Sequence, residues 1–158
     1  MEELLQLKSH LLDRNYEAAI AVVEELETMS RQDKINTLES YLTILLIHLI
    51  KIQVEKRLTN SWLVSIRNSI HEIKRRNRLG KKSHYIKQDE WLEHFNEVIS
   101  EAVVDASQEI FGGIDTKELR AMIDLKSLQN KTLELLELTY SNKNSEEIKA
   151  YLEQKFVF

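Results

Sequence analysis

Apolar residues between positions 30 and 56 recur at the spacing of one helix face. The intervals alternate between three and four residues, which is the period of an α-helix. The residues of this apolar seam are Ile35, Leu38, Leu42, Leu45, Leu49 and Ile52. Further apolar residues between 41 and 54 flank the seam, so most of the helix circumference is apolar. We therefore predict that residues 30–56 form a buried central helix surrounded by other helices.

Two shorter helical patterns precede the central helix. Residues 2–13 and 16–28 predict two helices that form an antiparallel hairpin, with Asn15 as the cap of the second and leucines on one side of the first. Ser30, with Asp33 three residues later, resembles a capping box, because a hydroxyl and a carboxylate at this spacing satisfy free amide groups. This pattern predicts that a new helix begins at Ser30.

The rest of the chain also has helical periodicity, with one exception. Thr59 or Asn60 is expected to cap a helix that ends at Gly80, and residues 81–88 predict an irregular loop. Further helices are predicted at residues 89–111, 116–124 and 128–140, and a short one from Ser145. The sequence thus predicts an all-α bundle of roughly six to eight helices. We expect residues 1–113 to form its main part and 114–158 a helical extension packed on the same domain.

Composition supports this fold and limits the chemistry. The chain has no proline and three glycines, so helix breakers are rare. It has no cysteine, which excludes disulfides and thiolate nucleophiles and fits a reducing cytosol. The start of the chain lacks the pattern of a signal peptide. The apolar run from Tyr41 to Val54 contains His48 and Lys51 and is shorter than the ~20 residues of a membrane span. We expect a cytoplasmic protein without membrane association.

Charge is distributed unevenly along the chain. The total is −4, but residues 51–87 carry 11 Lys and Arg against two Glu. The residues that we consider for binding, here called the basic cluster, are Arg67, Lys74, Arg75, Arg76, Arg78, Lys81 and Lys82. They supply the cations that bind phosphates, although no interleaved aromatic residues or base-reading motif accompany them. Nucleic-acid binding through residues 67–82 is therefore one functional hypothesis.

Acidic residues form a complementary pattern. The predicted helix at 89–111 carries an acid at every fourth position, a group that we call the acidic ridge: Glu93, Glu97, Glu101, Asp105 and Glu109. Like charges at this spacing repel each other by ~0.2 to 0.5 kcal/mol per pair in an isolated helix. A basic cluster and an acidic ridge favour complementary contacts, within one chain or between two. We expect a homo-oligomer or a protein partner to use them.

The five histidines show no recognised metal motif. Neither Glu-x-x-His nor His-Glu-x-x-His occurs, so we expect no metal and no cofactor. A site that His48, His71 and His94 form on three helices stays open as a weaker alternative, although His94 falls on the predicted solvent side of its helix. His48 lies beside the apolar seam and should need a hydrogen-bond partner on a neighbouring helix, such as Ser61 or Glu24.

Three segments carry a family resemblance. They are LESYLTILLIHLIKIQ from Leu38, NSWLVSIRNSIHEI from Asn60 and WLEHFNEVISEAVVDASQEI from Trp91. Over residues 1–113 the chain resembles the bacterial helical family catalogued as domain of unknown function twenty-nine. The resemblance covers the acidic stretch 24–29 and the pattern residues His48, Lys51, Ser61, Trp62 and Arg67, to which we assign structural roles. It implies a helical bundle without an established activity. The sequence departs from the family pattern at Ile52 and at residues 54–56.

The sequence leaves three functional hypotheses. Enzyme signatures such as a glycine-rich phosphate loop or a GxSxG motif are missing, so we expect no catalytic residues. The leading hypothesis is a non-catalytic helical interaction protein that uses its charged surfaces. A nucleic-acid-binding protein is the alternative, and a histidine-centred metal-dependent enzyme is the third.

Overall fold

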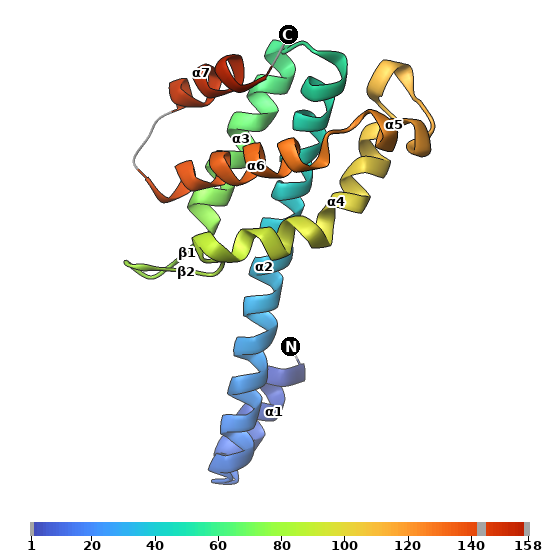
Figure 1. The fold of residues 1–158 in the computed structure, drawn as a ribbon. Helices are drawn as coiled ribbons and strands as arrows, with labels where there is room; N and C mark the ends of the chain where they lie inside the picture. Colours follow the sequence, from blue (N-terminus) through green and yellow to red (C-terminus); the bar gives the residue numbers. More distant parts are fainter. Residues whose placement is uncertain (1, 142–144, 157–158) are drawn as a thin grey trace. The chain divides into compact units, whose positions relative to one another are not determined.

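The computed structural model describes residues 2–141 and 145–156. These residues form seven α-helices, three short 3-10 helices and one two-stranded hairpin, which confirms the predicted all-α class (Figure 1). The chain divides into two compact units, Met1–Asn36 and Thr37–Phe158. The basic cluster, the acidic ridge and the apolar seam from Leu38 onward belong to the second unit, whereas Ile35 of the seam belongs to the first.

The first unit is a helical hairpin, as predicted. Helix α1 (Glu2–Leu12) ends at a turn in which Arg14 has a φ of 58°. Asn15 then caps the next helix, because its Oδ1 accepts a hydrogen bond from the amide of Ala18 at 3.2 Å. Ala19 and Val22 are buried, but the leucines predicted to face inward from α1 are not: Leu4, Leu5, Leu11 and Leu12 are all exposed. A hairpin of two helices has too little facing surface to bury both apolar sides.

The predicted helix boundary at Ser30 is wrong. Helix α2 runs without interruption from Tyr16 to Glu55, and both Ser30 and Asp33 lie inside it. The segment around Ser30 contains neither glycine nor proline, so the backbone hydrogen bonds of the helix continue through it. The two helices predicted at 16–28 and 30–56 are therefore one helix of 40 residues.

Helix α2 also has the length and apolar composition of a membrane-spanning segment. An 18-residue window reaches a mean hydropathy of 1.3, and 44% of that window is buried within the protein. The core helix of a soluble protein meets the same criterion, so this finding is weak evidence for a membrane segment. The cytoplasmic location expected from the sequence stays a prediction.

The core of the second unit is built around the C-terminal part of α2. The apolar seam is fully buried from Leu38 to Ile52, which confirms the central role predicted for it, whereas residues 30–37 contain no buried side chain. Helices α3 (Asn60–Arg76), α4 (Trp91–Ser107) and α6 (Leu125–Glu137) supply many of the other large buried residues. These are Leu63, Ile66, Ile70, Ile73, Trp91, Phe95, Val98, Leu128, Leu135 and Leu136.

The remaining elements connect or cover these helices. They are the 3-10 helices η1 (Gln88–Glu90), η2 (Ile110–Gly112) and η3 (Leu138–Tyr140), and helices α5 (Thr116–Met122) and α7 (Ser145–Lys155). Thr59 caps α3 as predicted, since its hydroxyl accepts from the amide of Trp62 at 3.1 Å. Helix α6 packs against α4, and α7 packs against α3. The proposed division between residues 1–113 and 114–158 stays a prediction.

The predicted loop at 81–88 is also wrong in part. Strands β1 (Arg78–Leu79) and β2 (Ser83–His84) form an antiparallel hairpin in which Arg78 pairs with His84 and Leu79 with Ser83. Gly80 makes the turn with a φ of +74°, a conformation that other residues rarely adopt. Ile86 follows the hairpin and is buried, so the segment is anchored to the core. Strands this short have no periodicity that a sequence pattern could reveal.

Candidate interaction surface

Part of the basic cluster is neutralised on its own helix. Glu72 on α3 accepts hydrogen bonds from Arg75 Nη2 at 2.9 Å and from Arg76 Nε at 2.7 Å. These hydrogen bonds, that of Arg75 first, lower the pKa of the Glu72 carboxyl below its usual value. The guanidinium of Arg76 also lies 5.6 Å from the centre of the Tyr41 ring. Arg75 and Arg76 are thus engaged with neighbouring side chains.

Two more residues of the cluster have partners inside the protein. Lys74 donates a hydrogen bond from Nζ to the backbone carbonyl of Ser141 at 2.5 Å, so its ammonium links α3 to the end of η3. Arg67 is half-buried on α3 and is engaged within the chain as well. These contacts give Lys74 and Arg67 a structural role and reduce the charge that the cluster offers to a ligand.

Three residues of the cluster form what we call the hairpin tip: Arg78, Lys81 and Lys82. All three are exposed, and their side chains make no hydrogen bond or ion pair with any other residue that the structure describes. They lie on the β1–β2 hairpin, which projects from the helices next to the end of α3 (Figure 1). The structure therefore divides the predicted basic cluster into an engaged part on α3 and a free part on the hairpin.

The base of the hairpin is fixed by a buried hydrogen-bond network. Asn77 Oδ1 accepts from the amide of Ile86 at 2.8 Å, and Asn77 Nδ2 donates to the carbonyl of Ile86 at 2.9 Å. The hydroxyl of Tyr140 donates to the same carbonyl at 2.6 Å and accepts from Trp91 Nε1 at 2.7 Å. Burial raises the pKa of Tyr140, so its hydroxyl keeps its proton. The cations of the hairpin tip are consequently mounted on a rigid base.

The acidic ridge lies on α4 and in the turn that follows it. Glu93, Glu97 and Glu101 are exposed, and Asp105 is half-buried. Glu109 forms an ion pair with Lys51, with Oε2 and Nζ 3.1 Å apart. Within residues 2–141 and 145–156, no ion pair joins the basic cluster to the ridge. The exposed acids thus remain open to a partner.

Three of the residues that carry the family resemblance lie in one group. The side chain of Lys51 is buried, and its ammonium pairs with Glu109 and lies 5.8 Å from the centre of the Trp62 ring. The guanidinium of Arg57 lies 5.0 Å from the same ring. His48 is one helical turn before Lys51 and experiences the charges of Lys51 and Glu109. Ser61, in contrast, is exposed on α3. The group ties α2 and α3 to the end of α4.

His48 does not use the partner that the sequence suggested. Its Nδ1–H donates to the backbone carbonyl of Ile44 in the same helix at 2.8 Å, so neither Ser61 nor Glu24 is needed. Burial is the main cause that lowers the pKa of His48 below its usual value of 6.5. His48 is therefore a histidine at the edge of the core with its polar atom satisfied locally.

His94 also differs from its prediction. It was expected to face solvent, but its Nδ1 lies 2.9 Å from Glu39 Oε2, and both side chains are mostly covered. Among the described residues, no group of three His, Cys, Asp or Glu side chains is arranged to hold a metal ion. Within that part of the chain, the three-histidine site considered above does not form.

The partners Glu72, Glu39 and Tyr140 did not enter the sequence prediction. Glu72 could have been found, because it precedes Arg75 and Arg76 by three and four residues and such side chains are neighbours on a helix. Glu39 and Tyr140 contact residues 55 and 49 positions away, His94 and Trp91. No local pattern indicates contacts at that distance along the chain.

No curated protein and no solved structure matches this chain. The family model described as "Domain of unknown function DUF29" matches residues 2–118. The matched segment extends from α1 into α5 and contains the hairpin tip, the acidic ridge and the group around Lys51. It confirms the resemblance noted in the sequence, and the chain belongs to the DUF29 family.

Proposed function

We propose that this protein is a non-catalytic interaction protein that associates with a second copy of itself, the hairpin tip of one copy contacting the acidic ridge of the other. The observation that carries the proposal is the free charge on both surfaces. The side chains of Arg78, Lys81 and Lys82 make no hydrogen bond or ion pair with a described residue, and the ridge presents Glu93, Glu97 and Glu101 to solvent.

The spacing of the acids supports this pairing. Successive glutamates of the ridge are four residues apart, about 6 Å along the axis of α4. Their mutual repulsion is relieved when cations bind between them. Because each copy carries both surfaces, two copies related by a two-fold axis can form the contact twice. The rigid base of the hairpin limits the entropy that is lost on binding.

Nucleic-acid binding, the alternative, is supported less well. Within the basic cluster, only the hairpin tip contributes cations without a described partner, so roughly three phosphates could be neutralised there, and affinity would be low at physiological salt. The engaged residues Lys74, Arg75 and Arg76 would first have to give up their present partners. An acidic protein surface of three carboxylates matches the available charge better.

Sedimentation measurements test the proposal. At about 100 μM protein the wild type should exceed the monomer mass at about 50 mM salt and approach it at about 500 mM, where surface charges are screened. The triple variant Arg78→Glu, Lys81→Glu, Lys82→Glu should be monomeric at both salts. The control variant Lys34→Glu, Lys117→Glu, Lys149→Glu makes the same change in net charge and should behave as the wild type.

Charge restoration sharpens this test. Mixing the tip variant with a Glu93→Lys, Glu97→Lys, Glu101→Lys variant should restore association, because each then carries the sign that the other requires. A wild type that is monomeric at both salts contradicts the proposal. The nucleic-acid alternative would be favoured instead if the wild type and the control variant bound duplex DNA and the tip variant did not.

A further inference from the structure

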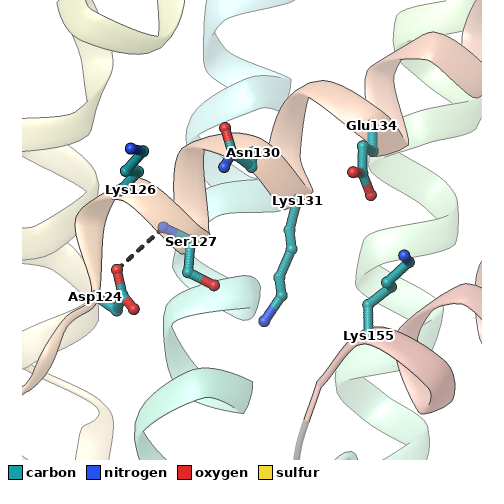
Figure 2. A pocket seen from close by; sticks show the side chains of 7 residues that line it. All are labelled: Asp124, Lys126, Ser127, Asn130, Lys131, Glu134 and Lys155. Atoms are coloured by element: carbon teal, nitrogen blue, oxygen red, sulfur yellow. Dashed lines mark hydrogen bonds between the residues drawn. The ribbon is translucent and has the colours of Figure 1, made fainter.

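A polar groove of about 380 Å³ lies between α6 and α7 (Figure 2). Its lining comes from the start and middle of α6 and from the end of α7, and it shares no residue with the hairpin tip or the acidic ridge. Each described residue that lines it is polar or charged. The groove is therefore suited to a polar ligand and is independent of the proposed self-association.

The two carboxylates of the groove already accept hydrogen bonds. Asp124 Oδ1 accepts from the amide of Ser127 at 3.1 Å and so caps α6. Glu134 Oε2 accepts from the hydroxyl of Tyr151. Burial, followed by the hydrogen bond to Glu134, raises the pKa of Tyr151, which keeps this hydroxyl protonated as a donor. Both acids are thus held by groups of the protein itself.

The cations of the groove are less occupied. Lys126 and Lys155 make no hydrogen bond or ion pair with a residue in the described part of the chain. The ammonium of Lys131 lies 4.2 Å from the centre of the Phe156 ring, a contact that orients the lysine without cancelling its charge. Figure 2 shows Lys131 and Ser127 extending from α6 to the same side, while Lys155 extends from α7 toward α6.

We propose that this groove binds a small anion that carries a phosphate group. Ammonium groups from two helices can contact different oxygens of one phosphate, and Ser127 supplies a hydroxyl donor beside them. A doubly charged phosphate has a more favourable electrostatic interaction with several cations than a singly charged carboxylate has. Because the groove is open to solvent, the ligand stays partly hydrated and its affinity depends on salt.

Titration of the full-length protein with inorganic phosphate tests the proposal. Amide chemical shifts should change saturably and chiefly in α6 and α7, at an ionic strength held constant with sodium chloride. The double variant Lys131→Gln, Lys155→Gln, which removes the two ammonium groups that Figure 2 shows on the same side of α6 as Ser127, should bind about tenfold more weakly, because two charged donors are lost. Lys155 makes no hydrogen bond or ion pair with a described residue, and the contact of Lys131 is with the Phe156 ring, so we expect the fold to be kept. The double variant Lys34→Gln, Lys117→Gln, which changes two exposed lysines on α2 and α5, is the matched control and should bind as the wild type.

Two further titrations identify the source of the phosphate group. Glycerol phosphate represents a soluble phosphate monoester, and vesicles with phosphatidic acid represent a lipid headgroup. Stronger binding of one of them, with the same loss in the double variant, supports the proposal and names the class. Two results would overturn the proposal. One is that sodium chloride at the same concentration causes the same chemical-shift changes, and the other is that the double variant binds phosphate as tightly as the wild type.

Discussion

Lys51 Nζ lies 3.1 Å from Glu109 Oε2, and this ion pair joins the C-terminal part of α2 to the turn after α4. The two side chains differ in environment, since 9% of Lys51 is exposed but 57% of Glu109. A buried ammonium depends on its counter-ion more than an exposed carboxylate does. Loss of the ion pair would therefore affect stability mainly because it leaves the buried ammonium of Lys51 without a counter-ion.

Glu109→Gln should lower the free energy of unfolding by about 1 kcal/mol, because Lys51 keeps its charge and loses its counter-ion while solvent still reaches the site. Urea denaturation at neutral pH measures the change. Glu97→Gln removes an exposed acid of the same ridge and should change stability by less than about 0.5 kcal/mol. Equal stabilities of the two variants would contradict a role for the pair.

Tyr140→Phe should destabilise the protein by about 1 to 3 kcal/mol, because Trp91 Nε1 loses its acceptor in a buried site. Amide exchange at Ile86 should become faster as the base of the hairpin loosens. Tyr151→Phe, which removes a hydroxyl bound to an exposed glutamate, is the control and should cost less than about 0.5 kcal/mol. Unchanged exchange at Ile86 in Tyr140→Phe would show that Asn77 alone holds the base.

The lowered pKa of His48 makes stability depend on pH. The folded protein favours the neutral imidazole, so below the usual value of 6.5 the unfolded chain binds a proton that the folded chain resists. The stability that the neutral His48 contributes is fully present above pH 6.5. It is lost as the pH falls from 6.5 through the lower pKa that His48 has in the folded state.

Urea denaturation between about pH 7.5 and about pH 5 tests this dependence. The wild type should lose stability over this range more steeply than His48→Gln, which has no imidazole to protonate. His71→Gln, at an exposed position of α3, should keep the slope of the wild type. A His48→Gln variant with the wild-type slope would mean that other groups cause the acid sensitivity.

The uninterrupted α2 gives Ser30 no capping role. Ser30→Ala should therefore be neutral or stabilise the helix by about 0.5 kcal/mol, since alanine has the higher helix propensity. Thr59→Ala removes an observed cap and should cost about 1 kcal/mol. Circular dichroism during urea denaturation compares the two variants. A loss of stability in Ser30→Ala that matches that of Thr59→Ala would indicate a helix start at residue 30 in solution.

The apolar seam was predictable because burial leaves a direct trace in the sequence. From Leu38 to Ile52 each residue at the three-and-four spacing is fully buried, since one face of α2 contacts the other helices over that length. The capping-box pattern at Ser30 led to a wrong helix boundary, because a local motif shows only that a helix could start there. It does not show whether the preceding turn is already helical.

The sequence predicted which charged residues form the candidate surface, but it did not predict which of them are free to bind a partner. The sequence shows where cations gather, but only the fold shows that Lys74 donates to the carbonyl of Ser141 and that the side chain of Arg78 makes no hydrogen bond or ion pair with a described residue. Likewise, the hairpin depends on Asn77 and Tyr140, which are 63 positions apart. Such contacts are set by the packing of helices and not by neighbouring residues.

Tyr140 closes the base of the hairpin, yet it lies beyond Glu118, where the family match ends. A recombinant fragment that ends at that boundary would keep the hairpin tip. The indole N–H of Trp91 in this fragment would have lost its hydrogen-bond acceptor, the Tyr140 hydroxyl. The fragment would also lack the leucines of α6 that cover α4, and such fragments tend to aggregate. Anyone expressing this family segment from this chain should therefore retain the downstream helices.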